Sequence, residues 1–255
     1  MLGAIAGDII GSIYEHDPIK HKDFALFDPR CTFTDDTVLT VAVAEAILTG
    51  TPYVECIRRF GRRHPNAGYG ASFIGWLQRD GAGPYNSWGN GSAMRVSAVG
   101  FAFDSEDEVL HQARLSAQIT HDHPEGVKGA QATALAVFLA RTGHDKASLR
   151  ARIASRFGYD LDRTVGDIRP GYTFDVSCQG SVPEALVAFL DAHDYEDAVR
   201  NAVSLGGDSD TLACIAGAVA EAFYGGVPQP IVAQVEARLT PDLLDVMQRF
   251  RDAFR

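Results

Sequence analysis

The sequence predicts an all-α protein, a compact single-domain orthogonal helical bundle. Long Ala- and Leu-rich stretches repeat with helical spacing, and each one closes near a glycine or a polar turn. The alternation of apolar and polar residues that is typical of a half-buried strand is absent, apart from a weak candidate near 172–177. No Pro- and Ser-rich linker, low-complexity tract or clear repeat divides the 255 residues, so we expect one domain over 1–255.

Four Ala-rich stretches are the clearest helices, and they lie at 37–50, 126–143, 182–194 and 211–226. They are apolar on several faces, so we expect one or more of them to be buried at the centre of the domain. Further helices are expected at 53–63, 92–101, 105–119, 146–157, 194–204, 228–239 and 241–253. The polar and glycine-rich stretches are expected to be loops, where functional residues usually lie: 15–35, 61–92 and 158–180.

The charge and hydropathy of the chain exclude several classes of partner. The formal net charge of −10 argues against nonspecific binding to nucleic acids and against binding to anionic membranes. A phosphate-bearing ligand stays compatible with this charge if a metal ion supplies the positive charge. No uninterrupted apolar run approaches the length of a membrane-spanning helix, so we expect no membrane partner.

The cysteines and the N-terminus predict a cytoplasmic protein. Cys31, Cys56, Cys178 and Cys214 form no CxxC pair, and their spacing resembles neither a zinc site nor a disulfide framework. We therefore expect buried free thiols in a reducing compartment. The apolar N-terminus lacks the basic region of a signal peptide, and Asp8 interrupts it.

Two acidic clusters carry the strongest chemical signal. The stretch 34–37 reads TDDT and the stretch 207–211 reads GDSDT, and each stands at the start of an Ala-rich helix. Asp, Ser and Thr are favoured at helix N-termini because they cap free N–H groups and suit the helix dipole. A cap needs only one residue, however, and each of these helices brings two carboxylates. Capping alone therefore does not account for the clusters.

Burial makes a metal site the better explanation of the two clusters. The runs that follow them are so apolar that the helix starts are expected near the protein interior. Partly buried carboxylates without a counter-charge are costly, and divalent cations remove that cost. Oxygen-only ligands favour Mg²⁺, Mn²⁺ or Ca²⁺ over zinc. Two ions roughly 3.5–4 Å apart would suit such a set and would activate water.

A glycine-containing loop at 87–95, SWGNGSAMR, is a candidate for binding phosphate. Its glycines allow close approach of the backbone to a ligand, and free N–H groups of the helix that follows would point at a phosphate. A tight polar turn produces the same residues. The loop is neither the dinucleotide-binding fingerprint nor a GxxxxGK phosphate loop.

The stretch 120–126, THDHPEG, offers two histidines for which metal binding and helix capping are both possible. Pro124 suits a first helical position, and Asp122 or His123 suits the cap before it. No further His or Cys partner stands nearby at ligand spacing. We favour a cap with one ligand-facing histidine over a zinc site.

These motifs together resemble the ADP-ribosylglycohydrolase family. This family includes the enzyme that removes ADP-ribose from dinitrogenase reductase and the ADP-ribosyl-acceptor hydrolases. The motifs appear in family order, and they extend from residue 1 to about 226: GAIAGDIIGSIYE, FTDDT, SWGNGSAMR, THDHPEG and GGDSDT. The resemblance implies an all-α fold with a binuclear Mg²⁺ or Mn²⁺ centre in a cleft.

The resemblance also implies a role for individual residues. The implied metal ligands are Thr34, Asp35, Asp36, Asp208, Asp210 and Thr211. Glu15 would lie beside the metals and the scissile ribose, and Glu15 or Asp35 would act as general acid or base. The implied substrate-binding residues are Ser87, Trp88, Gly89, Asn90, Gly91, Ser92 and His121, the last against the ADP part. Met94 and Arg95 are expected in packing and structural pairing.

The resemblance implies a metal-dependent hydrolase that cleaves the glycosidic bond between ADP-ribose and an acceptor and releases ADP-ribose. We expect a monomer that acts through an oxocarbenium-like transition state. The family covers more than one linkage, so the acceptor is an arginine, a serine or another side chain, a nucleic-acid end, or a small metabolite. Two alternatives stay open: a non-catalytic ADP-ribose-binding protein, and a metal-dependent nucleotide phosphohydrolase. A Ser-His-Asp hydrolase is poorly supported because no GxSxG motif occurs.

Overall fold

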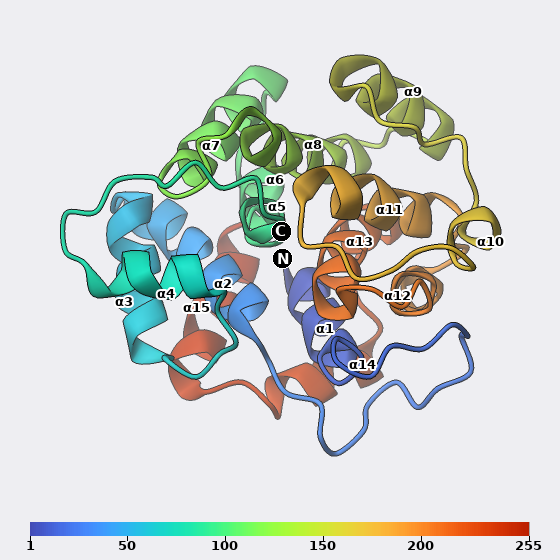
Figure 1. Cartoon of the computed structure of the whole chain (residues 1–255), viewed down its shortest axis with the longest axis horizontal. Helices are drawn as coiled ribbons and strands as arrows, with labels where there is room; N and C mark the ends of the chain where they lie inside the picture. The colour runs from blue at the N-terminus through green and yellow to red at the C-terminus, as the bar shows by residue number, and fades with distance from the viewer. Residues whose placement is uncertain (255) are drawn as a thin grey trace.

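The computed structural model describes residues 1–254, which form fifteen helices and no strand (Figure 1). The first half of the described chain contains α1 (Leu2–Gly11), α2 (Asp35–Thr49), α3 (Tyr53–Arg63), α4 (Ala71–Gln78), α5 (Gly91–Met94), α6 (Ser97–Ala102) and α7 (Glu106–Gln118). The second half contains α8 (Pro124–Arg141), α9 (Lys146–Phe157), α10 (Val165–Ile168), α11 (Cys178–Leu190), α12 (Tyr195–Val203), α13 (Ser209–Tyr224), α14 (Gln229–Glu236) and α15 (Pro241–Ala253). The predicted all-α class is confirmed.

Most predicted helices are present with small shifts at their ends. The four Ala-rich stretches are α2, α8, α11 and α13, and each begins a few residues earlier than predicted. The predicted bounds of α3, α9 and α15 agree with the structure. The predicted helix 92–101 is wrong as a single element, because it breaks into α5 and α6. Arg95 (φ −86°, ψ −5°) and Val96 (φ −91°, ψ −4°) lie near the bridge region of backbone conformation, and this interrupts the helix.

Three helices were not predicted, and one predicted strand is wrong. α4 and α10 are short and lie inside the stretches 61–92 and 158–180, which we expected to be loops throughout. All ten residues of α1 are buried, so it shows no polar face to mark it as a helix. The candidate strand near 172–177 forms only an isolated antiparallel bridge between Ser177 and Gly89. The rest of that segment has no partner strand, which a sheet requires.

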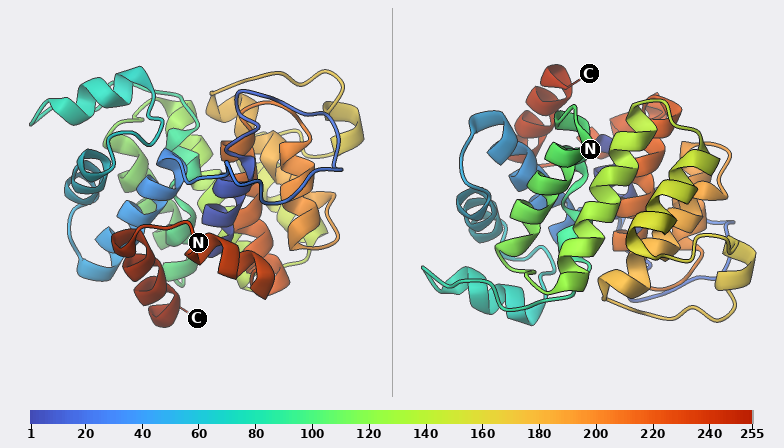
Figure 2. Two further views of the ribbon diagram at one scale, coloured as in Figure 1. Left: turned by 90° about the horizontal axis from the view of Figure 1, so that it is seen from below. Right: turned by 90° about the horizontal axis from the view of Figure 1, so that it is seen from above.

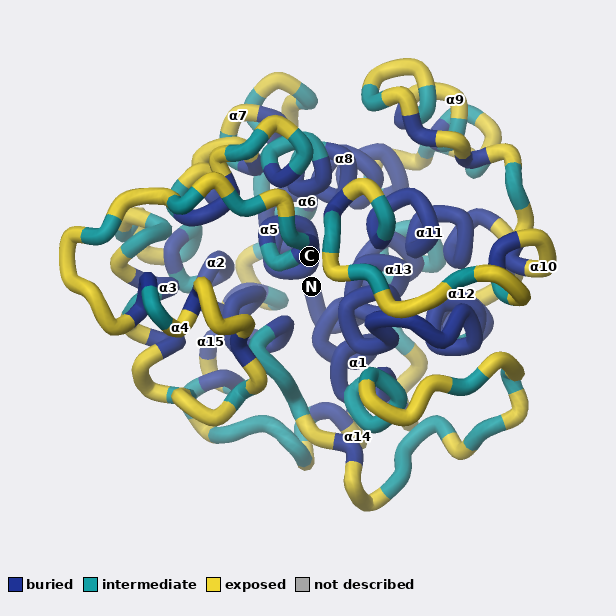
Figure 3. The backbone as a smooth tube through the Cα atoms, in the orientation of Figure 1, coloured by how far each residue is buried: buried dark blue, intermediate teal, exposed yellow. Residues whose placement is uncertain are grey.

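Helix α13 lies at the centre of the structure and packs against α1, α8, α11 and α12. Figures 1 and 2 show α1 running beside α13 near the middle of the molecule. In Figure 3 both helices are buried over most of their length, and the exposed segments lie around them. The predicted central buried helix is therefore present. All four cysteines are free and buried, as predicted.

Glycines allow α1 and α13 to approach backbone to backbone. A Cβ atom built on Gly7 would lie 2.0 Å from the carbonyl oxygen of Ala213, and one built on Gly217 would lie 2.3 Å from that of Gly3. A Cβ on Gly11 would lie 2.5 Å from the Cα of Asp210. No side chain fits at these positions, so the contact fixes the position of the second acidic cluster relative to the N-terminus.

Within residues 1–254, no helix combines the length and the apolar character that crossing a bilayer would require.

The contact between α1 and α13 predicts the effect of adding one methyl group. We expect Gly7→Ala to lower the free energy of unfolding by about 3 kcal/mol or more, because backbone cannot move aside as a side chain can. The measurement is urea denaturation. Gly75→Ala in α4 is the matched control, since its Cβ would meet only Arg79 Nη2, at 3.9 Å. The control should be neutral or stabilising by up to about 1 kcal/mol. Equal effects in both variants would contradict this account of the packing.

Candidate metal centre

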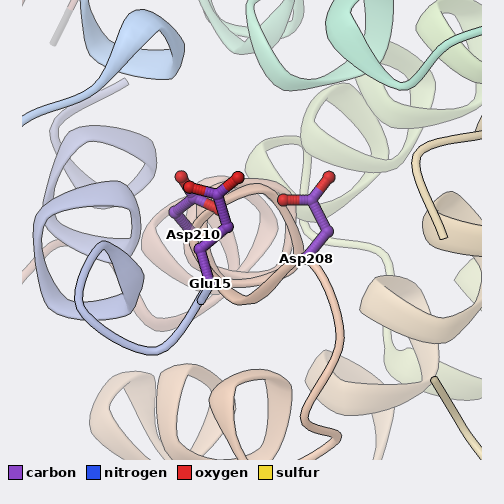
Figure 4. Close-up of side chains that lie close together, drawn as sticks. All are labelled: Glu15, Asp208 and Asp210. Atoms are coloured by element: carbon purple, nitrogen blue, oxygen red, sulfur yellow. The ribbon is translucent and has the colours of Figure 1, made fainter. Parts of the chain in front are cut away.

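The two acidic clusters meet in space at the N-terminal ends of α2 and α13. The hydroxyl of Thr211 donates a hydrogen bond of 3.4 Å to Asp36 Oδ1, which joins the second cluster to the first. Glu15 extends from the segment after α1 toward the same point. One carboxylate oxygen from each of Glu15, Asp208 and Asp210 lies within 4.8 Å of the others. Figure 4 shows these three carboxyl groups side by side over the start of α13.

The two helix starts differ in how they use capping bonds. Thr34 is the N-cap of α2, and its hydroxyl oxygen accepts a hydrogen bond from the Asp36 backbone N–H at 3.2 Å. Asp208 holds the same position in α13 but makes no capping bond with its side chain. Its Oδ2 instead accepts a hydrogen bond of 2.7 Å from Asn90 Nδ2. Capping therefore accounts for the Thr34 hydroxyl, whereas the Asp208 carboxylate points away from its own helix toward Asn90.

Asp8 supports the first cluster, and sequence reasoning missed this role. It is fully buried, and it accepts hydrogen bonds from the backbone N–H of Thr34 at 3.0 Å and of Thr37 at 3.1 Å. The hydroxyl groups of both threonines also donate to its carboxylate. Four donors thus fix the start of α2 on α1. The signal was present in the sequence, because one aspartate inside a helix-length apolar stretch needs buried partners.

Burial and mutual repulsion raise the pKa values of these carboxyl groups. Desolvation, followed by repulsion from Asp8, raises the pKa of Asp35 to about 8. Desolvation raises the pKa of Asp8 itself to about 6, against the lowering effect of its hydrogen bonds. The pKa values of Asp36 and Asp210 are raised well above the ordinary range for the same two reasons as Asp35: desolvation and neighbouring carboxylates.

The carboxylates lack a Lys or Arg partner among residues 1–254, so the cluster suits a divalent cation. In the described chain no Lys or Arg forms an ion pair with the clusters, and only the exposed His16 approaches Glu15, at 3.6 Å. The buried Oδ2 atom of Asp36 has no hydrogen-bond partner among residues 1–254. The atoms that could coordinate a metal ion here are all oxygen atoms, which Mg²⁺, Mn²⁺ and Ca²⁺ prefer as ligands. These residues therefore fit the predicted metal centre.

A cavity of about 400 Å³ opens over the two clusters. It brings together most of the residues that the sequence singled out, namely Glu15, Thr34, Asp35, Asp36, Ser87, Gly89, Asn90, Gly91, His121, Asp208, Asp210 and Thr211. Asn90 links the glycine loop to the second cluster through Asp208, and its Nδ2 also donates to Ser181 Oγ at 3.0 Å. The glycine loop, His121 and the acidic clusters thus share one cavity.

Two predicted substrate-binding residues lie outside the cavity wall. Trp88 is 50% exposed, and its ring packs edge-on against His123 at 5.7 Å between centroids. The hydroxyl of Ser92 is buried and donates to the carbonyl oxygen of Gly126 at 2.7 Å. His123 caps α8 by accepting a hydrogen bond from the Glu125 N–H at 3.1 Å, as the sequence predicted.

Tyr85 and Arg95 line the cavity although the sequence did not place them there. Arg95 is fully buried and donates from Nη2 to the carbonyl oxygen of Ser116 at 2.8 Å. The structural pairing expected for Arg95 is therefore present, together with a place on the cavity wall. Its position follows the break between α5 and α6, which a helix prediction over 92–101 conceals.

The raised pKa values predict how the metal-free protein responds to pH. Above pH about 4 the unfolded chain has lost protons that the folded carboxyl groups still hold. Stability must then fall as the pH rises, by up to about 1.4 kcal/mol per pH unit for each extra bound proton. We expect this fall from about pH 4 to about pH 8, and a levelling at higher pH, where the folded Asp35 has also lost its proton. The measurement is urea denaturation in EDTA at each pH.

Two comparisons assign this pH dependence to the cluster. Asp35→Asn should show a smaller fall, whereas Asp162→Asn should behave as the wild type, because the Asp162 side chain is 90% exposed. Added Mg²⁺ or Mn²⁺ should also reduce the fall, since a bound cation replaces the protons. A wild-type stability that is flat or rises over this range in EDTA would contradict the raised pKa values.

Comparisons with known proteins give the family. A sequence model of the family described as ADP-ribosylglycohydrolase matches residues 1–255. The chain is 30% identical to ADP-ribosylhydrolase ARH3 of Homo sapiens over 305 residues, covering 88% of this chain and 84% of that protein. It is 25% identical to ADP-ribosylarginine hydrolase Tri1 of Pseudomonas putida over 272 residues, covering 92% and 72%. A solved structure described as an ADP-ribosylglycohydrolase-related protein complex is similar in fold, with a TM-score of 0.74 at 24% identity, covering 100% of this chain and 97% of that one. The chain therefore belongs to the ADP-ribosylglycohydrolase family.

Proposed function

We propose that this protein is a metal-dependent hydrolase that cleaves the glycosidic bond between ADP-ribose and an acceptor and releases ADP-ribose. The observation that carries the proposal is the convergence of both acidic clusters, the glycine loop and His121 on one cavity. Family membership and the names of the two hydrolase relatives support the same activity. The acceptor is a protein side chain or a small ADP-ribosylated molecule.

The acidic residues are proposed to hold two Mg²⁺ or Mn²⁺ ions. The proposed ligands are Thr34, Asp35, Asp36, Asp208, Asp210 and Thr211. The carboxylates of Asp36, Asp208 and Asp210 are buried without cationic partners among the described residues. The unpaired Oδ2 of Asp36 gives one oxygen that is free to bind. Bound divalent cations would supply Lewis-acid polarisation of ribose oxygens and activation of water near neutral pH.

The glycine loop is proposed to hold the rest of the substrate. Gly89 and Gly91 leave the cavity open beside His121, since a Cβ on either would approach the imidazole to 3.4 or 3.3 Å. Asn90 and Ser92 would hold this loop in shape, and His121 would contact the ADP part. Ser87 and Trp88 would lie alongside, with Trp88 reaching the ligand from outside the cavity wall.

Glu15 and Asp35 are the proposed acid and base. In the reaction a water oxygen bonds to the anomeric carbon of the ribose as the acceptor leaves, and one proton must move to the acceptor. Burial, then the charge of Asp208, raises the pKa of Glu15, which suits a group that gives and takes protons near neutral pH. Its side chain keeps 28% of its surface exposed and so can exchange protons with solvent. Cations would lower the basicity of Asp35.

We further propose that residues 1–255 act as one domain, as a cytoplasmic monomer. The apolar core supports the single domain, because one cluster contains side chains from the first helix to the last, including Leu2 of α1 and Phe250 of α15. The close contact of α1 with α13 ties the N-terminus to the C-terminal part of the chain.

The first test is release of ADP-ribose from arginine-linked and serine-linked ADP-ribosyl peptides. Each peptide would be incubated with the protein in Mg²⁺, in Mn²⁺ and in EDTA, and products identified by mass spectrometry. We expect metal-dependent release from at least one peptide. The Asp35→Ala/Asp36→Ala variant should lose at least 100-fold in rate, because it removes proposed ligands. The Asp104→Ala/Asp162→Ala variant is the matched control, since both side chains are at least 90% exposed.

Each other outcome points to a different function. Tight binding of ADP-ribose by calorimetry, without release from any substrate of a broad panel, would identify a binding protein. Release of phosphate from a nucleotide, without free ADP-ribose, would identify a phosphohydrolase. Absence of both binding and release would overturn the proposal.

Asp8 predicts a separate effect on metal affinity. Asp8→Asn replaces an acceptor-only carboxylate with an amide whose NH₂ cannot accept from Thr34 or Thr37, so the start of α2 loses its support. We expect metal affinity to fall about 10- to 100-fold, as measured by calorimetry on folded protein. Asp197→Asn is the control, because this buried aspartate bonds to Lys22 and His193 away from the cavity. An unchanged affinity in Asp8→Asn would show that Asp8 only stabilises the fold.

A further inference from the structure

Arg95 is a buried cation without a carboxylate partner. It is fully buried, and in the described chain it forms no ion pair. Its Nη2 atom donates to Ser116 O at 2.8 Å and to Thr120 Oγ1 at 3.0 Å, whereas its Nε and Nη1 atoms have no partner. Such a charge is costly to bury without a counter-charge. Arg95 lies on the wall of the cavity, next to Tyr85 and His121.

The hydrogen bond that Arg95 donates to Thr120 determines the direction of the hydrogen bond between Thr120 and His121. Thr120 Oγ1 lies 2.7 Å from His121 Nδ1. A guanidinium can only donate, so the Thr120 oxygen accepts from Arg95. The Thr120 hydroxyl is buried and has no other acceptor among residues 1–254, so its proton is satisfied only if it goes to His121 Nδ1. His121 Nδ1 is then an acceptor without a proton.

The other ring nitrogen faces the glycine loop. A Cβ built on Gly89 would lie 3.4 Å from His121 Nε2, and one on Gly91 would lie 3.3 Å away. Both positions lack a side chain, so Nε2 faces the space between them and the cavity. Within the described residues Nε2 has no hydrogen-bond partner, whereas Nδ1 has one. The hydrogen-bond partner of Nε2 must then be a ligand or a solvent molecule.

We propose that Arg95 and Thr120 are positioning residues that fix His121 as the Nε2–H tautomer, so that a neutral imidazole donates a hydrogen bond to an oxygen of the bound diphosphate. The inference rests on the proposed function for the identity of the ligand. The hydrogen-bond chain runs from Arg95 through Thr120 to His121 and ends at the cavity.

The electrostatics support a neutral donor. Burial, and then the charge of Arg95, lower the pKa of His121 well below its usual value, so the ring stays neutral at physiological pH. The positive charge that complements an anionic ligand comes from Arg95 behind the ring, and His121 adds direction instead of charge. The cavity thus has an acidic side, formed by the two clusters, and a cationic side, formed by Arg95.

The test compares Thr120→Val with Thr120→Ser. Valine has nearly the shape of threonine but no hydroxyl, and serine restores the hydroxyl. The first readout is the ¹⁵N spectrum of the His121 ring in the free protein, where a pyrrole-type Nε2 and a pyridine-type Nδ1 are expected in the wild type and in Thr120→Ser. In Thr120→Val a mixture of tautomers is expected. Thr133→Val is the control, because Thr133 Oγ1 is buried without any partner among the described residues.

The second readout is the affinity for ADP-ribose in Mg²⁺, measured by calorimetry. We expect Thr120→Val to bind about five- to tenfold more weakly, with Thr120→Ser and Thr133→Val near the wild type. A wild-type ring protonated on Nδ1, or an unchanged ring spectrum and affinity in Thr120→Val, would overturn the proposal. The expected ring spectra together with no binding of ADP-ribose by the wild type would leave the tautomer established and refute both the proposed ligand and the proposed function.

Discussion

The contact between α1 and α13 is the constraint on which the site depends. Because Gly7 and Gly217 have no side chains, the two backbones touch, and α1 can lie in only one register along α13. That register puts Asp8 under the start of α2 and puts Gly11 against Asp210. The chain that leaves α1 then brings Glu15 to Asp208 and Asp210. A packing requirement in the core thus determines the distances between carboxylates in the cavity.

The same packing leaves charged or titratable groups buried without a partner on both sides of the cavity. The carboxylates around Asp36 and Asp210 are buried by the helices that position them, and the described chain supplies no cation to them. Across the cavity the reverse holds, since Arg95 is buried without an anion. A cation bound at one side and an anion at the other would satisfy both surfaces. The arrangement agrees with the proposed ligand, which carries phosphate and would be held next to divalent metal ions.

The sequence predicted what is local and missed what depends on contacts between distant segments. α2 and α13 are visible because an Ala-rich run follows a cluster of capping residues. α1 was missed because a helix buried on every side has no amphipathic period. The motifs placed Asp35 and Asp208 in the site, but no spacing rule could bring them together across most of the chain. Arg95 was assigned to pairing alone, because nothing in its neighbourhood shows that a helix breaks there and turns it to the cavity wall.

The aspartates at the helix starts of this chain differ in whether their carboxylates cap the helix. Asp145 and Asp194 are the N-caps of α9 and α12, and each accepts a hydrogen bond from the backbone N–H three residues later. Asp208 holds the same place in α13 and makes no such bond. Its backbone explains the difference, since ψ is 77° at Asp208 but near 167° and −178° at the other two. The altered backbone turns the carboxylate from its own helix toward Asn90 and the cavity, at the cost of a cap worth about 1 kcal/mol. Asp208 thus lacks a stabilising bond that two other helix starts of this chain form, which agrees with its proposed role as a metal ligand.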